Sequence, residues 1–232
     1  MTLECEVVPL AERSLSVLLQ MFPQAAGVLE EAGILFCCYG ARALQEAAAA
    51  AGYKTDDLIA MITARPAGRN FIDWMQRPLA DLTEYLTADH KRIALEAVPA
   101  LRERIDREVR RNPEVSELKR MKIIFDDMAS KLTPHMAHEE RDLFPWIATA
   151  ENRGMRGIRF AQRVLREHVE HKATCDHLRT LGELAGRVRI DDGQLYAAVE
   201  QFARPLRHHI HLENNVLYPR VIEVENRMRR AG

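Results

Sequence analysis

The sequence predicts an all-α protein in which a small helical domain precedes an up-down four-helix bundle. Runs of alternating β-branched residues, the usual sign of strands, are nearly absent. Alanine, leucine, glutamate and arginine instead fill segments that have helical periodicity. Turns containing proline or glycine divide these segments into several short ones and then four long ones. The short connections between the long segments favour antiparallel neighbours, as in a bundle.

The N-terminal part is expected to form short helices followed by a linker. Ser14, Pro23 and Thr55 are start signals, and glycines close the segments. A polar segment with proline and glycine, Arg65-Pro-Ala-Gly-Arg-Asn70, then interrupts the periodicity. We therefore expect two domains, residues 1–70 and 71–232. The predicted short helices are Leu10–Met21, Gln24–Ala32, Gly40–Ala51 and Thr55–Thr63.

Four longer helices are expected in the second domain. Asn112-Pro113, Asn152-Arg-Gly154 and Asp191-Asp-Gly193 are the turns between them. Pro134 and Pro205 fall inside predicted helices, where proline removes a backbone hydrogen bond, so either the helices bend there or they end there. The predicted long helices are Leu79–Arg111, Pro113–Ala150, Gly157–Arg187 and Asp191–Arg229.

One pattern, H-x-x-x-E-x-x-x-L-[F/Y]-P, occurs twice, at His135–Pro145 and at His209–Pro219. Positions i and i+4 lie on the same face of a helix, so each copy presents an imidazole and a carboxylate together. An acidic residue followed by histidine lies upstream of each copy, at Asp89-His90 and at Glu167-His168. If the two halves pack about a pseudo-two-fold axis, four imidazoles and two carboxylates meet in the bundle core, as a dinuclear metal centre requires.

The predicted ligands contain no thiolate, which suits iron or manganese, allows zinc and argues against copper(I). A single H-x-x-x-E match is common in helices, where such pairs add modest stability, but two copies in the same frame with the same tail make chance a poor explanation. Histidines without a counterpart in the repeat are expected to be solvated or to support the ligands, although His171 could share the face of His168. The candidate metal ligands are His90, His135, Glu139, His168, His209 and Glu213.

Composition excludes several classes of function. Lysine and arginine number 33 against 34 aspartates and glutamates, so charge does not indicate binding to nucleic acid or to an anionic membrane. The sequence contains no apolar run of membrane-spanning length and no signal-peptide pattern at its start, so we expect a cytoplasmic protein. The cysteines should then be mostly reduced, and their spacing fits neither a disulfide framework nor a zinc site.

The order of the motifs resembles the hemerythrin-like di-iron domain of the repair-of-iron-centres family. The segment Gly33-Ile-Leu-Phe-Cys-Cys-Tyr-Gly40, followed by an alanine-rich helix, is similar to that family's small N-terminal domain with vicinal cysteines. The resemblance covers essentially the whole chain. It implies a cytoplasmic protein that restores iron-sulfur clusters damaged by nitric oxide or oxidants. It also implies a non-haem centre of two iron ions, oxo- and carboxylate-bridged, on the four histidines and two glutamates above.

The family's Cys-Cys-Gly-Gly signature is Cys37-Cys38-Tyr39-Gly40 here, which removes one glycine from a tight turn. Two roles remain open for these thiols. They could be buried as small apolar side chains. Alternatively, their place just before a helix start would lower a thiol pKa and favour a redox role or iron capture at Cys37 and Cys38. Cys5 and Cys175 belong to no motif and are given no role.

Three functions are compatible with these features. The first is repair, with damaged or apo iron-sulfur proteins as partners and NO or O2 as small molecules. The second is reversible binding or sensing of O2 or NO, and the third is catalytic reduction of NO or peroxide. The sequence does not decide whether the protein is an enzyme, and a linker near residue 70 would permit a homodimer with exchanged domains.

Overall fold

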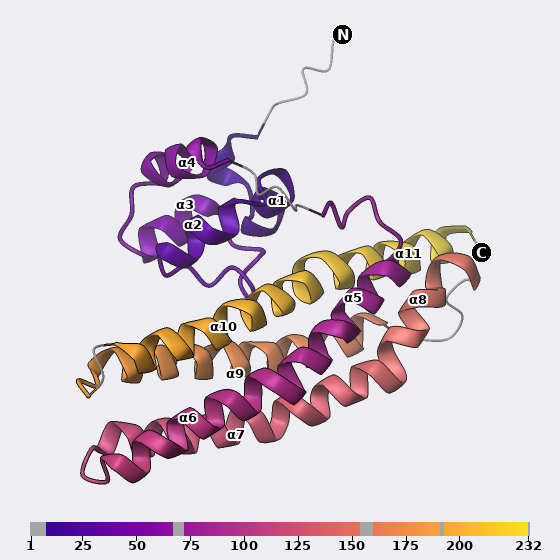
Figure 1. Cartoon of the computed structure of the whole chain (residues 1–232). Helices are drawn as coiled ribbons and strands as arrows, with labels where there is room; N and C mark the ends of the chain where they lie inside the picture. The colour runs from indigo at the N-terminus through magenta and orange to yellow at the C-terminus, as the bar shows by residue number, and fades with distance from the viewer. Residues whose placement is uncertain (1–7, 67–71, 154–159, 191–192, 232) are drawn as a thin grey trace.

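The computed structural model of the chain describes residues 8–66, 72–153, 160–190 and 193–231. Within these ranges every regular element is a helix, which confirms the all-α prediction (Figure 1). The predicted boundary near residue 70 falls in 67–71 and therefore lies outside the described residues.

The N-terminal part is a cluster of short helices with its own apolar core. Ser14 caps α1 as its position predicts, because its Oγ accepts a hydrogen bond from the backbone N–H of Val17. The core residues include Leu15, Leu29 and Leu58, all fully buried. The elements are a 3₁₀ turn at Leu10–Glu12, α1 at Leu15–Met21, α2 at Ala25–Glu31, α3 at Leu44–Ala50 and α4 at Thr55–Ala64.

Four long helical rods follow, close to the predicted bounds. Three of them contain one widened, π-helical turn, which separates each rod into two α-helical parts. The first rod is α5 (Leu79–Arg92), a π turn (Ile93–Ala97) and α6 (Val98–Arg111); the second is α7 (Ser116–His138), a π turn (Glu139–Leu143) and α8 (Phe144–Arg153); the third is α9 (Phe160–Arg187); the fourth is α10 (Gln194–Leu212), a π turn (Glu213–Leu217) and α11 (Tyr218–Ala231).

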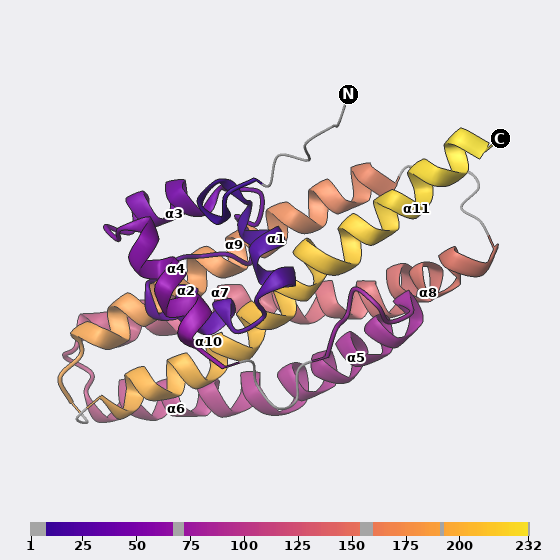
Figure 2. The same ribbon diagram turned by 90° about the horizontal axis from the view of Figure 1, so that it is seen from above.

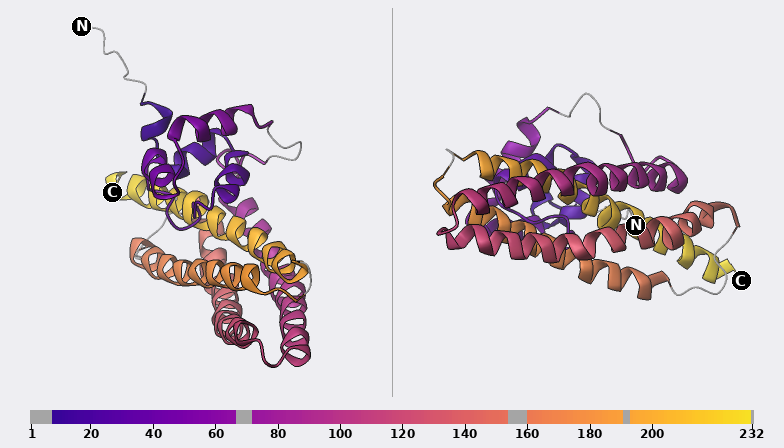
Figure 3. Two further views of the ribbon diagram at one scale, coloured as in Figure 1. Left: turned by 90° about the vertical axis from the view of Figure 1, so that its left-hand side faces the viewer. Right: turned by 60° about the horizontal axis from the view of Figure 1, so that its bottom comes forward.

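The rods form a closed bundle, because α6 contacts both α7 and α10, and α9 contacts the same two helices. The view along the bundle shows this cross-section, with the N-terminal helices on one side of it (Figure 3, left). Two apolar clusters fill the interior. One contains Met136 and Ile210, and the other contains Leu143 and Leu212. The polar site described below lies on the helices between these clusters.

The N-terminal helices lie over α9 and α10 (Figure 2). Glu30 of α2 forms ion pairs with Arg204 and Arg207 of α10, at 3.4 and 3.5 Å. Phe36, in the loop after α2, is buried and packs edge-on against the ring of His211. The loop from Phe36 to Gly40 is therefore held directly against the bundle.

Pro134 and Pro205 do not end their helices, since α7 and α10 continue through them to residues 138 and 212. The change in helical winding comes later, at the two motif glutamates, which begin the π turns. In the described part of the chain, none of the helices is both long and apolar enough to span a membrane.

Candidate metal centre

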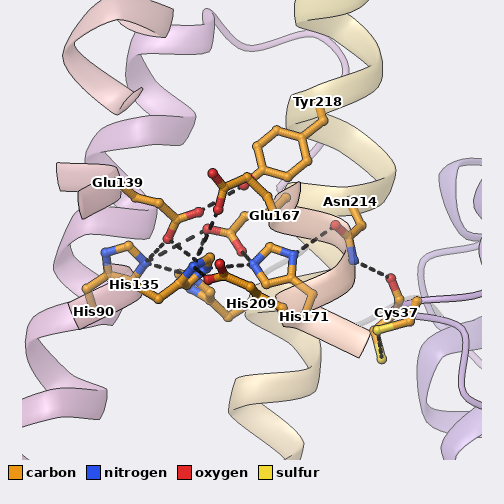
Figure 4. A network of polar contacts seen from close by, with 12 residues as sticks. Cys37, His90, His135, Glu139, Glu167, His171, His209, Asn214 and Tyr218 are labelled. Carbon is orange, nitrogen blue, oxygen red and sulfur yellow. Dashed lines mark hydrogen bonds and ion pairs between the residues drawn. The ribbon is translucent and has the colours of Figure 1, made fainter. Parts of the chain in front are cut away.

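Two pairs of histidines face each other in the middle of the bundle (Figure 4). The Nε2 atoms of His90 and His209 are 2.9 Å apart, and those of His135 and His171 are 3.0 Å apart. Each pair joins two rods, α5 with α10 and α7 with α9. The side chain of His135 is the most exposed of the four, at 7%, and the others are at 1–3%. The pairs are thus shielded from solvent, with one side slightly open.

Glu213 reaches both histidine pairs. It lies one helical turn after His209, and its Oε1 is 3.1 Å from the Nε2 of that residue. Its Oε2 is 3.1 Å from the Nε2 of His171 in the other pair. A fully buried carboxylate whose two oxygens face different imidazole pairs is placed to bridge two cations.

Glu139 lies opposite Glu213 and is also fully buried. Its Oε2 is 3.5 Å from the Nε2 of His90 and 3.4 Å from the Nε2 of His135. Its Oε1 accepts a hydrogen bond of 2.9 Å from the hydroxyl of Tyr218. Tyr218 is buried in one of the apolar clusters, and its hydroxyl also orients this carboxylate.

The outer nitrogen of each imidazole, Nδ1, has an acceptor of its own. Such an acceptor places the proton on Nδ1 and leaves the lone pair of a neutral imidazole on Nε2, pointing into the site. The four pairs are His90 with Glu140 (3.2 Å), His209 with Asp89 (3.3 Å), His135 with Glu170 (2.8 Å) and His171 with Asn214 (2.9 Å).

The structure brings together five of the six predicted residues, but the prediction that His168 joins them is wrong. The Nε2 of His168 lies 3.2 Å from the backbone oxygen of Cys38, at the side of the bundle that faces the N-terminal helices. His171, three residues later, takes the place in the cluster. The segment Glu167-His168-Val169-Glu170-His171 contains an acidic residue followed by histidine twice, and the first occurrence misled the alignment of the two halves.

Two contacts show that His171 is the counterpart of His90. Asp89, just before His90, accepts from the Nδ1 of one motif histidine, and Glu170, just before His171, accepts from the other. The aromatic residues of the two motif tails also correspond, since Phe144 stacks on the ring of His90 and Tyr218 lies parallel to the ring of His171. The sequence signal for the inward face of α9 was the apolar pair Cys175 and Leu178, four and seven residues after His171. Both side chains are buried in the structure.

The remaining histidines lie outside the cluster, as expected from the repeat. His138 and His177 pair with exposed or half-buried aspartates on the surface of the bundle. His211 is buried, but its Nδ1 lies 3.0 Å from the side-chain nitrogen of Asn215 and not near the four imidazoles. Among the described residues, no group of potential metal ligands contains any of these three or His208.

Burial and charge separate the pKa values within the site. Burial lowers the pKa of His171 to about 4, so this ring is neutral at pH 7. Burial also disfavours a charge on His209, but the carboxylates of Glu213 and Asp89 outweigh it and raise the pKa to about 9. Burial raises the pKa of Glu139 well above its usual range, and the charge of Glu213 adds to this effect. For Glu213 itself, His209 and His171 overcome the effect of burial and hold the pKa well below its usual range.

The chemistry of these donors fits metal cations. When the Nδ1 atoms of His135 and His171 donate to Glu170 and Asn214, the two Nε2 atoms face each other across 3.0 Å, and two lone pairs at this distance repel unless a cation or proton lies between them. The buried Oε2 of Glu139 has no hydrogen-bond partner, which is costly for an isolated buried oxygen. Imidazole and carboxylate without thiolate are ligands for iron, manganese or zinc. Two groups of these residues could each hold a metal ion, His90 with His209 and Glu213, and His135 with His171 and Glu139.

The local sequence explains why the π turns are found here. A proline lies two residues after the end of each π turn, at Pro99, Pro145 and Pro219. Proline lacks an N–H and its ring collides with the carbonyl four residues earlier, which in each case belongs to the π turn. For Pro219 that carbonyl is on Asn215, and it accepts hydrogen bonds from the side chains of Ser16 and Gln20, both at 3.4 Å. Widened turns of this kind occur frequently at functional sites.

The vicinal cysteines form a second buried cluster, next to the first. Cys37 and Cys38 lie in the loop after α2, and Cys175 of α9, which the sequence left without a role, lies 3.1 and 3.0 Å from their sulfurs. Asn214 connects the two clusters, because its Oδ1 accepts from His171 and its Nδ2 donates to the carbonyl of Cys37 (Figure 4). The glycine missing from the signature does not disturb this loop: Gly40 is retained, and it is the position where the side chain of Asn215 leaves no room for a Cβ.

A comparison with known protein families identifies the family of this helical bundle. The model of the hemerythrin HHE cation-binding domain matches residues 81–221, well over half of the chain. The chain belongs to this family. All six clustered residues, His171 included, lie within the matched range, so the family of cation-binding domains and the donor set found in the structure agree.

Individual relatives match beyond this domain. An iron-sulfur cluster repair protein, YtfE, of Yersinia pseudotuberculosis serotype IB (strain PB1/+) is 29% identical over 223 residues, which cover 92% of this chain and 98% of the relative. The protein of the same name from Yersinia pestis (strain Pestoides F) matches with the same identity and coverage. The similarity of this hemerythrin HHE protein to these relatives therefore extends over its N-terminal cysteine loop as well as its bundle.

Proposed function

We propose that this protein repairs damaged iron-sulfur clusters and that two iron ions occupy the histidine and glutamate cluster. The observation that carries the proposal is the set of four inward Nε2 atoms with two buried carboxylates between them. The full-length similarity to proteins named for iron-sulfur cluster repair supports the same function.

His90, His209 and Glu213 would hold one iron, and His135, His171 and Glu139 the other. Bound iron supplies a redox-active centre that can be given up to an acceptor or can react with nitric oxide. The protein orients the ligands through the Nδ1 acceptors and excludes water through the apolar clusters on both sides. The bridging role of the two glutamates is part of this proposal, and an oxo bridge between the ions stays a prediction.

The two proposed iron positions differ in access. His135 lines a surface pocket together with Glu167 and Glu170, whereas His90 and His209 line none of the described pockets. The side chain of Glu170 is 61% exposed, so the outer hydrogen bond of His135 is open to water. We infer that the iron held by His135 leaves first and that the pocket beside it is where an acceptor protein would collect it.

The first experiment measures iron in protein purified without oxygen and without added metal. We expect two irons per chain in the natural protein and a marked loss in His171→Ala. His168→Ala is the matched control, because it removes a histidine of the same helix that lies outside the cluster, and it should keep its iron. Equal loss in both variants, or one zinc ion in place of iron, would contradict the proposed centre.

The second experiment tests repair itself. Iron-loaded protein is mixed with an apo iron-sulfur protein, and transfer is followed by the return of cluster absorbance, alongside NO consumption with an electron donor. Repair requires that the chain loses iron to the acceptor, whereas steady consumption of NO would indicate a reductase. The double variant Cys37→Ala/Cys38→Ala should slow transfer and leave NO turnover unchanged. Normal transfer by this variant would exclude a role of these two thiols in delivery.

The remaining parts of the proposal concern where and with whom the protein acts. We propose that it acts in the cytoplasm on damaged or apo iron-sulfur proteins, as two domains, residues 1–70 and 71–232. A homodimer is also proposed, and light scattering on the purified protein would decide it. Separate expression of residues 71–232 tests the domain division, because an independent domain would retain its helices and its iron.

A further inference from the structure

The three buried cysteines form a compact triangle that the proposed iron centre does not use. The sulfur of Cys175 lies 3.1 Å from that of Cys37 and 3.0 Å from that of Cys38, and the last two are 3.8 Å apart. All three are free thiols, at most 6% exposed. They come from two separate parts of the fold, because Cys38 and Cys175 are 137 positions apart in the sequence.

The surroundings of the triangle are apolar. The three cysteines belong to the core cluster of the bundle, with Met136 and Leu178 among its other members. In the described part of the chain, no histidine, aspartate or glutamate joins the three sulfurs as a fourth donor within 4.8 Å. A cation bound here would therefore have sulfur ligands only.

These features distinguish among thiophilic cations. Zinc in thiolate sites is almost always held by four ligands in a tetrahedron, and iron in thiolate sites usually has four as well. Copper(I) is selected by soft thiolate ligands and does not need a hard oxygen ligand or water. It is the cation whose preferences match three sulfurs without a fourth donor. The imidazole and carboxylate centre has the opposite character and does not suit it.

We propose that Cys37, Cys38 and Cys175 form a second metal site, which binds one copper(I) ion through three thiolates. This site joins the N-terminal loop to α9, so the bound ion would link the two parts of the fold. It does not depend on the proposed repair function, because none of its ligands belongs to the histidine and glutamate cluster.

Binding requires the loss of thiol protons. Hydrogen bonds from Cys175 and Cys38 lower the pKa of Cys37 well below its usual range, and the nearby Arg207 acts in the same direction. The hydrogen bonds with Cys37 and Cys38 raise the pKa of Cys175. For Cys38 the hydrogen bond with Cys175 lowers the pKa, but the hydrogen bond with Cys37 and burial outweigh it and the pKa is raised. The shared hydrogen bonds thus favour loss of the first proton from Cys37. Binding of copper(I) forms three copper–sulfur bonds and releases to solvent the thiol protons still on the three sulfurs, with no change in oxidation state.

The site also has a route to solvent. A surface pocket reaches Cys37 and is lined by Glu30, Glu200 and Arg207 among others. Cys37 is the only one of the three cysteines that lines this pocket, so its sulfur is the first that a cation from solvent would reach. The first contact of the ion would be with Cys37, followed by transfer into the triangle.

The test is a titration of the full-length, reduced protein with copper(I) without oxygen, in competition with a colorimetric copper(I) chelator. We expect one tightly bound ion per chain, a higher melting temperature on binding, and release of thiol protons to solvent. X-ray absorption at the copper edge should show three sulfur neighbours. Zinc(II) and iron(II) are titrated in parallel and should bind this site more weakly.

Cys175→Ser removes the third ligand with almost no change in size. Its copper affinity should fall by more than about 100-fold, because changes outside the ligand shell alone typically cost about 10- to 100-fold. Cys5→Ala is the control, since it removes one thiol from the chain and leaves the triangle intact. Circular dichroism establishes that the serine variant is folded, and Cys175→Ala is titrated if it is not.

Several results would overturn the proposal. They are the absence of tight copper(I) binding, an affinity unchanged in both Cys175 variants, two sulfur neighbours in place of three, or tighter binding of zinc or iron in competition. The iron content of the other cluster is measured in the same samples. Loss of copper binding with iron retained shows that the two sites are separate.

Discussion

The two copies of the repeated motif have the same framework but face different surroundings. In both, the residue after the motif glutamate accepts a hydrogen bond from the Nδ1 of the histidine on the neighbouring rod: Glu140 for His90 and Asn214 for His171. Glu140 is one-third exposed at its side chain, whereas Asn214 is 7% exposed and lies under the N-terminal loop.

The difference shows how the residue after the motif glutamate can support a histidine and also bind a second part of the fold. A glutamate can only accept, so Glu140 supports its histidine and nothing else. An asparagine amide also donates, and Asn214 uses this donor on the carbonyl of Cys37. The two copies also differ at the following residue. Arg141 of the first copy points to solvent, whereas Asn215 of the second donates to the carbonyls of Phe36 and Cys37. The second copy therefore supports the metal cluster and also holds the cysteine loop in place.

The largest effect is expected where the loop meets the second copy. A Cβ on Gly40 would lie 2.6 Å from the Cγ of Asn215 and closer still to its Oδ1. Gly40→Ala should therefore destabilise the protein by about 1–3 kcal/mol, as overpacking of a buried site does. Because the chain is long, this corresponds to a melting temperature lower by about 2–4 °C per kcal/mol, measured by calorimetry.

Gly182→Ala is the matched control for this substitution. Its Cβ would meet Glu200 at 3.4 Å, an ordinary contact, and alanine is favoured over glycine inside a helix. A stability equal to or above that of the natural protein is expected. In the double variant Gly40→Ala/Asn215→Ala the two effects should not add, because the side chain that collides is absent. Additive losses would show that the loop does not dock as described.

The next pair of substitutions should distinguish the two copies directly. Asn214→Ala leaves the buried Nδ1 of His171 without its acceptor and removes one of the two donors to the carbonyl of Cys37, at a cost of about 1–3 kcal/mol. Glu140→Ala, the equivalent change in the first copy, should cost less than about 1 kcal/mol, because water can reach this position. Urea unfolding of the metal-free variants gives both values. Equal costs would mean that the two copies differ in sequence but not in energetic role.

The smallest effect appears only in acid. Burial lowers the pKa of His211 to about 3, below its value near 6.5 in an unfolded chain. The unfolded state therefore binds more protons between these pH values, so this contribution to stability is complete above pH 6.5 and is lost as the pH falls. The corresponding residue of the first copy is Ala137, which is exposed and cannot titrate.

His211→Gln should reduce the slope of unfolding free energy against pH by up to about one proton between pH 6.5 and 4. The measurement is urea unfolding of metal-free protein at a series of pH values. His138→Gln serves as the control, because this histidine is exposed and pairs with Asp142 on the surface. An unchanged slope in His211→Gln would assign the acid sensitivity to other groups.

Much of the fold could be predicted because residues close to a helix end in the sequence determine where the helix begins or stops. Asn112-Pro113 and Thr55 gave bounds within a few residues of those observed, whereas the helix expected from Leu10 begins at Leu15, after the Ser14 cap. The π turns could not be predicted in this way. Pro99, Pro145 and Pro219 are compatible with a kink, a helix end or a widened turn, and the choice depends on what accepts the freed carbonyl. For Asn215 the partners come from a distant part of the chain, at Ser16 and Gln20.

In the metal site, too, the residues set by local spacing could be predicted and those set by distant contacts could not. Spacing of i and i+4 was sufficient for His135 with Glu139 and for His209 with Glu213. The choice between His168 and His171 depends on how α9 is rotated about its axis, since three residues correspond to most of one turn. That rotation is fixed by Cys175 and Leu178 packing into the bundle. The contact of Cys175 with the vicinal cysteines could likewise not be predicted from the sequence, because these partners lie 137 and 138 residues away.

The π turns set the register of everything that follows them. Each residue advances an α-helix by about 100°, so deletion of one residue from Glu213–Leu217 would turn α11 by about that angle relative to α10. The hydroxyl of Tyr218 would leave Glu139, and the carbonyl of Asn215 would turn away from the N-terminal helices. A one-residue deletion in this segment would thus break two contacts at once, that of the Tyr218 hydroxyl with Glu139 and that of the Asn215 carbonyl with the N-terminal helices. An equivalent deletion in the exposed turn at residues 112–115 would leave both contacts in place.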